Sequence, residues 1–218
     1  MSKQLITVVD YGMGNLRSVA KALEHVAPDA RVLVTNDNDA IATADRVVFP
    51  GQGAARDCMA QLAAHGVVDA ICSAFRDKPF LGICMGLQVL FERSDENGGV
   101  DCLGLVRGGV HPFGQDLRDP DSGARLSVPQ MGWNQVWQAD SNHPLWDGIA
   151  EGARFYYCNS YYVEPQDHML AVGRSLYGRG FTCAIAQDNV FACQFHPEKS
   201  ADDGLKLLGN FVRWNGTY

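Results

Sequence analysis

Residues 79–92, PFLGICMGLQVLFE, place an apolar run directly before a segment with helical spacing. The run, residues 79–84, is typical of a strand buried on both faces, as in a parallel sheet. The remaining residues, 85–92, predict a helix that begins without an intervening loop. Gly82 and Gly86 flank the junction, which allows a strand and a helix to pack closely around a tight turn. The stretch therefore predicts a strand–helix unit of an α/β fold.

The same alternation runs through the N-terminal part of the chain. Short β-branched runs predict strands, and amphipathic segments predict helices. The predicted strands are 5–9, 30–35, 46–50 and 79–84, and the predicted helices are 16–26, 54–66 and 85–92. Asn15 stands where an N-cap of the first helix is expected. This alternation indicates a parallel sheet with helices on both faces.

The pattern changes between residues 103 and 190. Short β-like runs, among them 125–128, are separated by Gly, Pro, Asn and Asp, which predicts antiparallel strands and long loops. The chain then returns to a helix that Ser200 is expected to cap, with Asp203 completing a capping-box spacing. We predict one α/β domain over residues 1–218. It has a mostly parallel central sheet, flanking helices and a smaller antiparallel β section.

Composition narrows the class of protein. The 218 residues carry a net charge of −7 and no Lys/Arg cluster, so we expect no nucleic-acid partner. No apolar run approaches the ~18 residues of a membrane span, so we expect no membrane partner. The N-terminal apolar run is too short for a signal peptide core. These features favour a cytoplasmic protein.

The seven cysteines are scattered, and no pair has a CxxC spacing. This spacing disfavours a zinc site, and we expect no metal. In a reducing cytoplasm the cysteines are expected to be free thiols. Six of them look like small apolar side chains that fill the core, and Cys84 is the exception.

Cys84 stands in G-I-C-M-G between the predicted strand and helix. This is the nucleophile-elbow pattern with Cys in place of Ser, and the turn presents the side chain at the carboxyl end of the sheet. The positive end of the following helix would favour a thiolate. The alternative is a buried structural cysteine beside two packing glycines.

A nucleophilic thiol needs a base, and His196 is the candidate. It follows the apolar run VFACQF, and Glu198 lies two residues further on. A histidine at a strand end, oriented by a carboxylate, is the base half of a triad. The other five histidines look like surface or loop residues. The alternative for His196 is a loop histidine beside a solvated glutamate.

Acyl transfer also needs donors for an oxyanion. Residues 49–57, FPGQGAARD, form a glycine-rich loop after a strand, where Gly51 and Gly53 leave backbone N–H groups accessible. No GKS or GKT follows, so this is not a phosphate-binding P-loop. The glycines of DYGMGN, residues 10–15, are better explained by a turn and a helix cap than by a dinucleotide site.

Four features now coincide: PGQG, GICMGLQ, QFHPEKS and the α/β order around them. Together they resemble the class I, or triad, glutamine amidotransferases. Two further stretches, DYGMGNLRSV at 10–19 and VPQMGWN at 128–134, are similar to the glutaminase subunits of imidazole glycerol phosphate synthases. This resemblance spans nearly the whole chain.

The resemblance implies a reaction and a set of residues. Cys84 attacks the side-chain amide of L-glutamine, and His196, oriented by Glu198, moves the protons. The oxyanion is held by backbone N–H groups of the loop near Gly53 and of Met85. The residues that match substrate-contacting positions are Gln88, Glu96, Ser160 and Tyr161.

The resemblance also implies a partner and no cofactor. A (β/α)8-barrel cyclase would form a heterodimer with this chain and receive ammonia through a channel. It would convert PRFAR to imidazole glycerol phosphate and AICAR in histidine biosynthesis. The MGWN segment and residues 156–162 are candidates for the partner-facing surface, although Trp133 and Trp137 taken singly read as core filling.

Three positions depart from the common family pattern. Gln52 replaces a usual Val, and Gln130 and Asn159 replace usual His residues. None is a triad residue, so they bear on switching of the oxyanion loop and on coupling to the partner.

Three other functions stay open from the sequence. One is a class I glutaminase that serves a different synthase. A second is a cysteine peptidase or esterase of related fold, which needs no partner. The third is an α/β binding module in which Cys84 is inert.

Overall fold

A computed structural model describes residues 3–218. Its strands are β1 Leu5–Val9, β2 Arg31–Thr35, β3 Arg46–Gly51, β4 Phe80–Cys84, β5 Phe91–Ser94, β6 Val100–Asp101, β7 Val106–Pro112, β8 Gln130–Gln135, β9 Trp137–Gln138, β10 Arg154–Asn159, β11 Tyr161–Pro165, β12 Ala171–Tyr177, β13 Arg179–Gln187 and β14 Val190–Cys193. The α-helices are α1 Leu16–Val26, α2 Asn38–Thr43, α3 Ala55–Ala64, α4 Val68–Asp77, α5 Met85–Gln88 and α6 Ala201–Arg213. Four 3-10 turns are η1 Glu96–Gly98, η2 Pro144–Trp146, η3 His168–Leu170 and η4 Pro197–Lys199.

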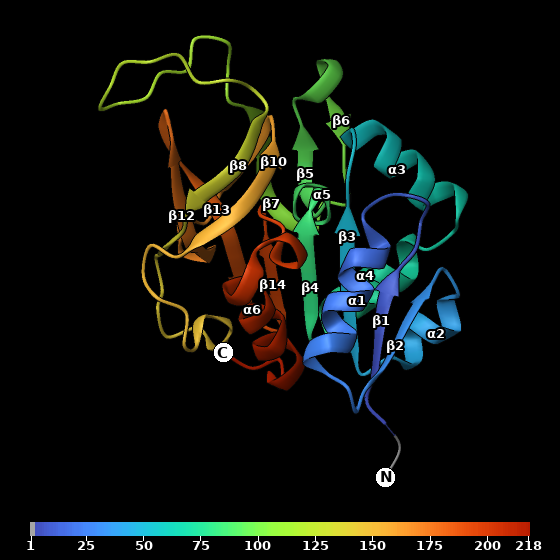
Figure 1. Cartoon of the computed structure of the whole chain (residues 1–218). Helices are drawn as coiled ribbons and strands as arrows, with labels where there is room; N and C mark the ends of the chain where they lie inside the picture. Colours follow the sequence, from blue (N-terminus) through green and yellow to red (C-terminus); the bar gives the residue numbers. More distant parts are fainter. Residues whose placement is uncertain (1–2) are drawn as a thin grey trace.

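The main sheet runs in the order β2-β1-β3-β4-β14-β13-β11-β7-β5-β6. Its first five strands are all parallel to one another. The central ones, β3, β4 and β14, are buried at every residue, as expected of strands covered on both faces. Helices α1 and α6 cover one face, and α2, α3 and α4 cover the other (Figure 1). The prediction of a mostly parallel sheet with flanking helices is confirmed.

The later strands add the antiparallel section. β13, β11 and β7 continue the sheet in antiparallel pairs, whereas β5 joins β7 in parallel. A separate two-stranded antiparallel sheet is formed by β8 and β10. In Figure 1 this ribbon lies beside β12. The prediction of a smaller antiparallel section is therefore also confirmed.

The predicted helix over residues 85–92 is wrong in its length. The helix α5 has only four residues and ends at Gln88, and β5 begins at Phe91 and pairs with β7. Val89, Leu90 and Phe91 are all fully buried, so an apolar run here fitted a helix or a strand equally well. The sequence reading also missed α2 and α4. It placed a strand at 125–128 where only an isolated bridge at Arg125 is formed.

Both predicted helix caps stand at the N-cap position, but neither side chain caps its helix. The Ser200 hydroxyl instead donates to the carbonyl of His196 (2.6 Å) and accepts from the backbone N–H of Tyr156 (2.9 Å). Ser200 is 1% exposed, so these two bonds satisfy a buried hydroxyl. Its role is to tie β10 to the segment that carries His196.

One of the five histidines predicted to be surface or loop residues is buried. His143 lies in the loop just before η2, as predicted, but it is only 1% exposed and packs against Phe191 and Trp214. Its Nδ1 accepts from the backbone N–H of Leu145 at 3.2 Å. Burial lowers the pKa of His143 to about 4, so it is a neutral packing residue.

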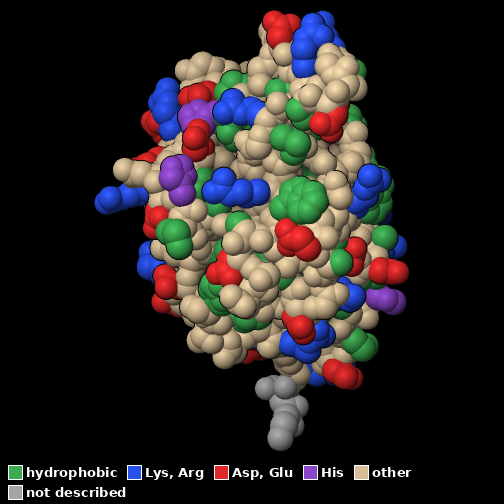
Figure 2. All heavy atoms as spheres, turned by 90° about the vertical axis from the view of Figure 1, so that its left-hand side faces the viewer, with side chains coloured by type: hydrophobic (Ala, Val, Ile, Leu, Met, Phe, Trp, Pro, Cys, Tyr) green, Lys and Arg blue, Asp and Glu red, His purple; other side chains and the backbone are tan. Residues whose placement is uncertain are grey.

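The side of the molecule that carries β8 and β12 exposes hydrophobic side chains that are separated by charged ones (Figure 2). Among the large hydrophobic residues exposed on β8, β9 and β12 are Met131, Trp133, Trp137 and Leu176. Trp133 and Trp137 are 51% and 44% exposed, so the expectation that they fill the core is wrong. Within residues 3–218 no single helix could cross a membrane, and the pair α3 and α4, bent by 100°, meets only the length and composition criteria.

Candidate active site

Cys84 ends β4 in a backbone conformation that is rare for a residue with a side chain, with φ 56° and ψ −109°. Such a sharp strand-to-helix turn exposes a nucleophile at the top of the sheet. A methyl group on Gly86 would overlap the carbonyl oxygen of Phe49. One on Gly82 would lie 2.9 Å from the Gly86 oxygen. Both glycines are thus required by close packing around Cys84.

His196 reaches Cys84 because β14 lies parallel to β4, with Cys193 paired to Ile83. The carboxyl ends of parallel strands meet at one edge of the sheet, so the two side chains lie together although they are far apart in the chain. The backbone N–H of His196 donates to the Tyr156 carbonyl at 2.9 Å, which fixes the start of the loop.

Glu198 orients the imidazole of His196. The ring Nδ1 lies 2.9 Å from Glu198 Oε1, and the two side chains are only 3% and 1% exposed. Burial acts to lower the pKa of His196, but the charge and hydrogen bonding of Cys84 and of Glu198 outweigh it and raise the pKa to about 10. The two neighbours therefore favour the protonated form of the imidazole.

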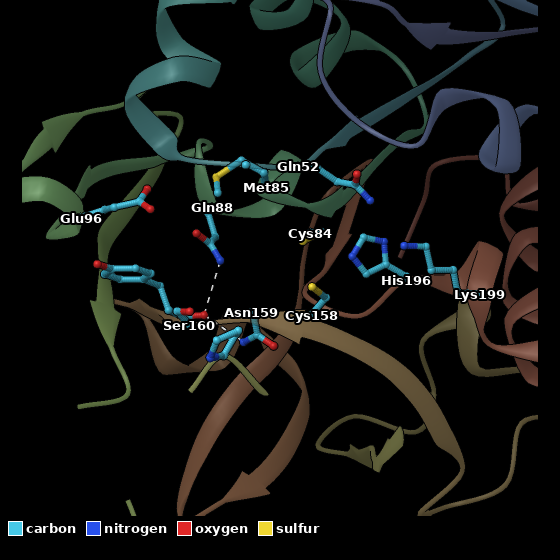
Figure 3. A pocket seen from close by; sticks show the side chains of 13 residues that line it. Gln52, Cys84, Met85, Gln88, Glu96, Cys158, Asn159, Ser160, His196 and Lys199 are labelled. Atoms are coloured by element: carbon cyan, nitrogen blue, oxygen red, sulfur yellow. Dashed lines mark hydrogen bonds between the residues drawn. The ribbon is translucent and has the colours of Figure 1, made fainter. Parts of the chain in front are cut away.

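The triad opens into a pocket of about 450 Å³. The labelled side chains of Gln88, Cys84 and His196 lie across it in that order, with Glu96 beyond Gln88 (Figure 3). The pocket is lined by Gln52, Gly53, Cys84, Met85, Gln88, Glu96, Pro129, Cys158, Asn159, Ser160, Tyr161, His196 and Lys199. Eight of the ten residues predicted from the sequence are therefore brought together here. Their individual roles stay predictions.

Two predicted residues do not line the pocket. Glu198 contacts His196 from outside the pocket lining, which is compatible with the predicted orienting role. Gly51 is the last residue of β3, paired with Cys84 and buried against Tyr11 and Met85. Because Gly51 has no side chain, it can pack this closely. The glycine of this loop that lines the pocket is Gly53, which has φ +93°.

Met85 begins α5, where a backbone N–H has no partner within the helix. Met85 and Gly53 line the same pocket as Cys84. Because α5 has only four residues, the long helix dipole expected from the sequence is not formed. The contribution of α5 is therefore limited to the N–H groups of its first turn.

The opposite wall carries the predicted substrate residues. Gln88 is 3% exposed, and its Nε2 donates to the Tyr161 carbonyl at 3.4 Å and to Gln194 Oε1 at 2.9 Å. Glu96 Oε2 accepts from the backbone N–H of Ala55 at 2.5 Å, at the start of α3. This leaves Glu96 one further carboxylate oxygen toward the pocket.

Sequence reasoning missed three polar residues around the pocket. Cys158 is exposed in β10 and is not a core filler. The alternation of this strand, with Phe155 and Tyr157 buried, could have indicated its outward direction. Lys199 lines the pocket with its Nζ 5.9 Å from the centre of the Tyr156 ring. Gln194 lies directly behind Cys84.

The expectation of free thiols is met, and the expectation that the other cysteines fill the core is met in part. All seven thiols are free, and Cys58, Cys183 and Cys193 are buried fillers, whereas Cys72 and Cys102 are half-buried. Within residues 3–218 no three His, Cys, Asp or Glu side chains gather as ligands of a metal ion would.

The comparisons with known proteins agree with this geometry. The family model for class I glutamine amidotransferases matches residues 7–214. An imidazole glycerol phosphate synthase subunit HisH from Thiobacillus denitrificans is 60% identical over 96% of this chain and 91% of that relative. A second HisH subunit, from Dechloromonas aromatica, is 57% identical over 98% of both chains.

Solved structures show the same fold at lower sequence identity. PurLQS from Thermotoga maritima superposes with a TM-score of 0.72 and 19% identity, covering 97% of this chain and 99% of that one. A glutamine amidotransferase from the same organism gives a TM-score of 0.62 and 13% identity, covering 98% of both chains. These likenesses bear on the fold alone. The family model and the close relatives decide the family: the chain belongs to the class I glutamine amidotransferases, among the HisH subunits of imidazole glycerol phosphate synthase.

Proposed function

We propose that this chain hydrolyses L-glutamine to glutamate and ammonia as the glutaminase subunit of an imidazole glycerol phosphate synthase. The observation that carries the proposal is the set Cys84, His196 and Glu198 at one pocket, in a chain 60% identical to a HisH subunit. We further propose that residues 1–218 act as a single glutamine amidotransferase domain, which the family match over 7–214 supports.

In the first step the sulfur of Cys84 attacks the carbon of the substrate carboxamide. The electron pair of the C=O bond moves to oxygen, and backbone N–H groups of Met85 and the Gly53 loop stabilise the oxyanion. In other acyl-transfer enzymes such a donor contributes about 10²–10³ in rate. The protonated His196 then gives its proton to the amide nitrogen, the C–N bond breaks, and ammonia leaves.

The second step returns the enzyme to its starting state. His196, now neutral, takes a proton from water, and the resulting hydroxide attacks the γ-glutamyl thioester. The C–S bond breaks, glutamate leaves, and Cys84 regains its negative charge beside protonated His196. Glu198 holds the imidazole in one orientation through both steps.

The substrate is proposed to lie along the wall opposite His196. Glu96 supplies negative charge for its α-ammonium group, and Ser160 and Tyr161 receive its α-carboxylate. Gln88 contacts the substrate between these groups and the sulfur. The support is that all four residues line the same pocket as Cys84.

The partner is proposed to be a (β/α)8-barrel cyclase that receives the ammonia and adds it to PRFAR. The relatives are named as subunits, which implies an assembly. On this chain, β8 carries Met131 and Trp133, 65% and 51% exposed, and Gln130 and Pro129 lead from that strand toward the pocket. Exposed Met and Trp side chains are typical of protein interfaces.

The test is to co-purify the chain with a barrel cyclase and measure glutamate formed from glutamine, with and without PRFAR. We expect slow hydrolysis by the isolated chain and a large increase when both partner and PRFAR are present. The absence of glutamate under every condition would contradict the glutaminase function. Equal rates with and without the partner would contradict coupling. Turnover of peptides or esters by the isolated chain would instead indicate a cysteine hydrolase.

A further inference from the structure

The side chain of Gln194 is the one polar group, among the described residues, that contacts both Cys84 and Gln88. It lies just after β14, is 0% exposed, and is anchored by its backbone N–H, which donates to the Cys183 carbonyl at 2.8 Å. Its Nε2 donates to Cys84 Sγ at 3.7 Å, and its Oε1 accepts from Gln88 Nε2 at 2.9 Å. None of the chemical steps above uses it.

The orientation of both amides follows from their neighbours. Gln88 Nε2 also contacts the main-chain carbonyl of Tyr161, which can only accept a hydrogen bond. The Gln88 nitrogen must therefore face Tyr161 and Gln194, so Gln194 must present its oxygen to Gln88. The nitrogen of Gln194 is then left to face the sulfur of Cys84.

Two consequences follow from this arrangement. A buried N–H that donates to sulfur stabilises the charged thiolate more than the neutral thiol. The carbonyl oxygen of Gln88 makes no hydrogen bond to the described residues and is available to a molecule in the pocket. The chain of hydrogen bonds runs from the Tyr161 carbonyl through Gln88 and Gln194 to the sulfur.

We propose that Gln194 is a positioning residue that holds the sulfur of Cys84 and the amide of Gln88 in one fixed arrangement. Only the expected effect on glutamine-dependent kinetics rests on the proposed glutaminase function. The effect of Gln194 on the thiol itself is independent of glutamine. The fixed arrangement aims the nucleophile at a substrate that Gln88 holds, and it favours the thiolate before the substrate arrives.

The experiment uses Gln194→Met, which keeps the volume of the side chain and removes both hydrogen bonds. The first measurement is the pH dependence of Cys84 alkylation by iodoacetamide. It is followed by mass spectrometry of the Cys84 peptide, because the exposed thiol of Cys158 lines the same pocket and can react as well. We expect the pH at the midpoint of Cys84 alkylation to rise by about one unit. This is the shift expected when a charged group loses one hydrogen bond.

The second measurement is made on the complex with its cyclase. We expect glutamine-dependent kcat/KM to fall by about 10- to 100-fold, while synthesis from added ammonium salt stays at the wild-type rate. The control is Cys193→Ala, at an equally buried neighbouring position whose thiol hydrogen bonds to the Phe195 carbonyl. It should keep the wild-type alkylation midpoint.

Three results would overturn the proposal. The first is a wild-type midpoint and wild-type kcat/KM in Gln194→Met. The second is an equal shift of the midpoint in Cys193→Ala, which would indicate general loosening. If Gln194→Met does not fold, Gln88→Leu is used in its place, because this change removes the hydrogen bond from Gln88 to the oxygen of Gln194. The third contradicting result is an unchanged midpoint of Cys84 alkylation in Gln88→Leu. A wild-type complex that forms no glutamate would contradict the proposed function, while the alkylation result would still decide the role of Gln194.

Discussion

The thiol of Cys84 defines the first prediction at the scale of single residues. Cys84→Ala should abolish glutamine-dependent synthesis by the complex, because Cys84 is the thiol whose charge and hydrogen bonding act on His196. Synthesis from ammonium salt should remain, since it does not need the glutaminase chemistry. The measurement is product formation with each nitrogen source, and Cys158→Ser is the matched control at the same pocket. Loss of both activities would assign Cys84 a structural role instead.

The backbone of Cys84 gives a second prediction. Its φ of 56° disfavours any side chain, and such strain typically costs of order 1–3 kcal/mol. Cys84→Gly should therefore unfold at a higher urea concentration than Cys84→Ala, with a free energy of unfolding about 1 kcal/mol larger. Both variants lack the thiol, so the comparison isolates the backbone. Equal stabilities would mean that this turn stores no strain.

The third prediction concerns the protonation of His196. Cys84 and Glu198 raise its pKa to about 10 against the effect of burial, so the ring should stay protonated through neutral pH in an NMR titration. Removing the negative sulfur in Cys84→Ala should lower this pKa by more than one unit, because a neighbouring anion favours the imidazolium. A titration near the ordinary value of about 6.5 in the wild type would contradict the ion-pair geometry.

Single residues also show what sequence reasoning could reach. Cys84 and the pair His196 and Glu198 could be named because each stands in a short local pattern. Gln194 stands in the same quoted motif as His196, yet its partners Cys84 and Gln88 are 110 and 106 positions away. Flanked by Cys193 and Phe195, it read as part of an apolar run. Only the packing of β14 against β4 reveals where its amide points.

At the scale of elements, Ser200 at the start of α6 fixes the segment that carries His196. Its hydroxyl joins the His196 carbonyl, in a buried bond, to the backbone N–H of Tyr156, in a part-buried one. Ser200→Ala should lower the free energy of unfolding by about 1–3 kcal/mol, because it removes a buried bond to the His196 carbonyl and leaves the part-buried N–H of Tyr156 without a partner. Asp203→Ala, in the first turn of the same helix, should change it by less than about 0.5 kcal/mol. Urea unfolding of both variants tests this; equal effects would restore an ordinary helix-capping role.

Elements differ in how well local sequence defines them. β1, β3 and β4 could be predicted because continuous apolar, β-branched runs are typical of buried parallel strands. The division of residues 85–94 into α5 and β5 could not, because Val89, Leu90 and Phe91 are buried in either form. Pairing of β5 with the distant β7 decides the outcome. Tertiary contacts therefore override a helix that would otherwise extend to Glu92.

At the scale of the whole molecule, the exposed face of β8 predicts where the partner binds. Trp133→Ala should weaken binding of the barrel cyclase at least tenfold, since a large aromatic side chain buried at an interface typically contributes about 2 kcal/mol or more. The variant should keep its melting temperature, because Trp133 is 51% exposed in this chain. Met169→Ala, 86% exposed on η3, is the control. Calorimetric titration measures both, and equal affinities would place the interface elsewhere.

The class of fold could be read from the alternation of patterns, but the order of strands could not. Nothing in the local sequence states that β14 lies between β4 and β13. That neighbourhood unites β4 and β14, which are more than 100 residues apart in the chain, and this explains why the triad could be named but not assembled from sequence alone.

The late position of β14 in the chain also affects how the protein folds while it is being synthesised on the ribosome. Synthesis runs from the N-terminus, so a nascent chain contains Cys84 long before it contains His196. Until residues 190–193 emerge, β4 lacks the neighbour that pairs with it on that side. An unfinished chain therefore has a nucleophile without its base and an open strand edge. Chains that stall before β14 therefore lack the base that the proposed reaction needs, and they are the ones most exposed to pairing with one another.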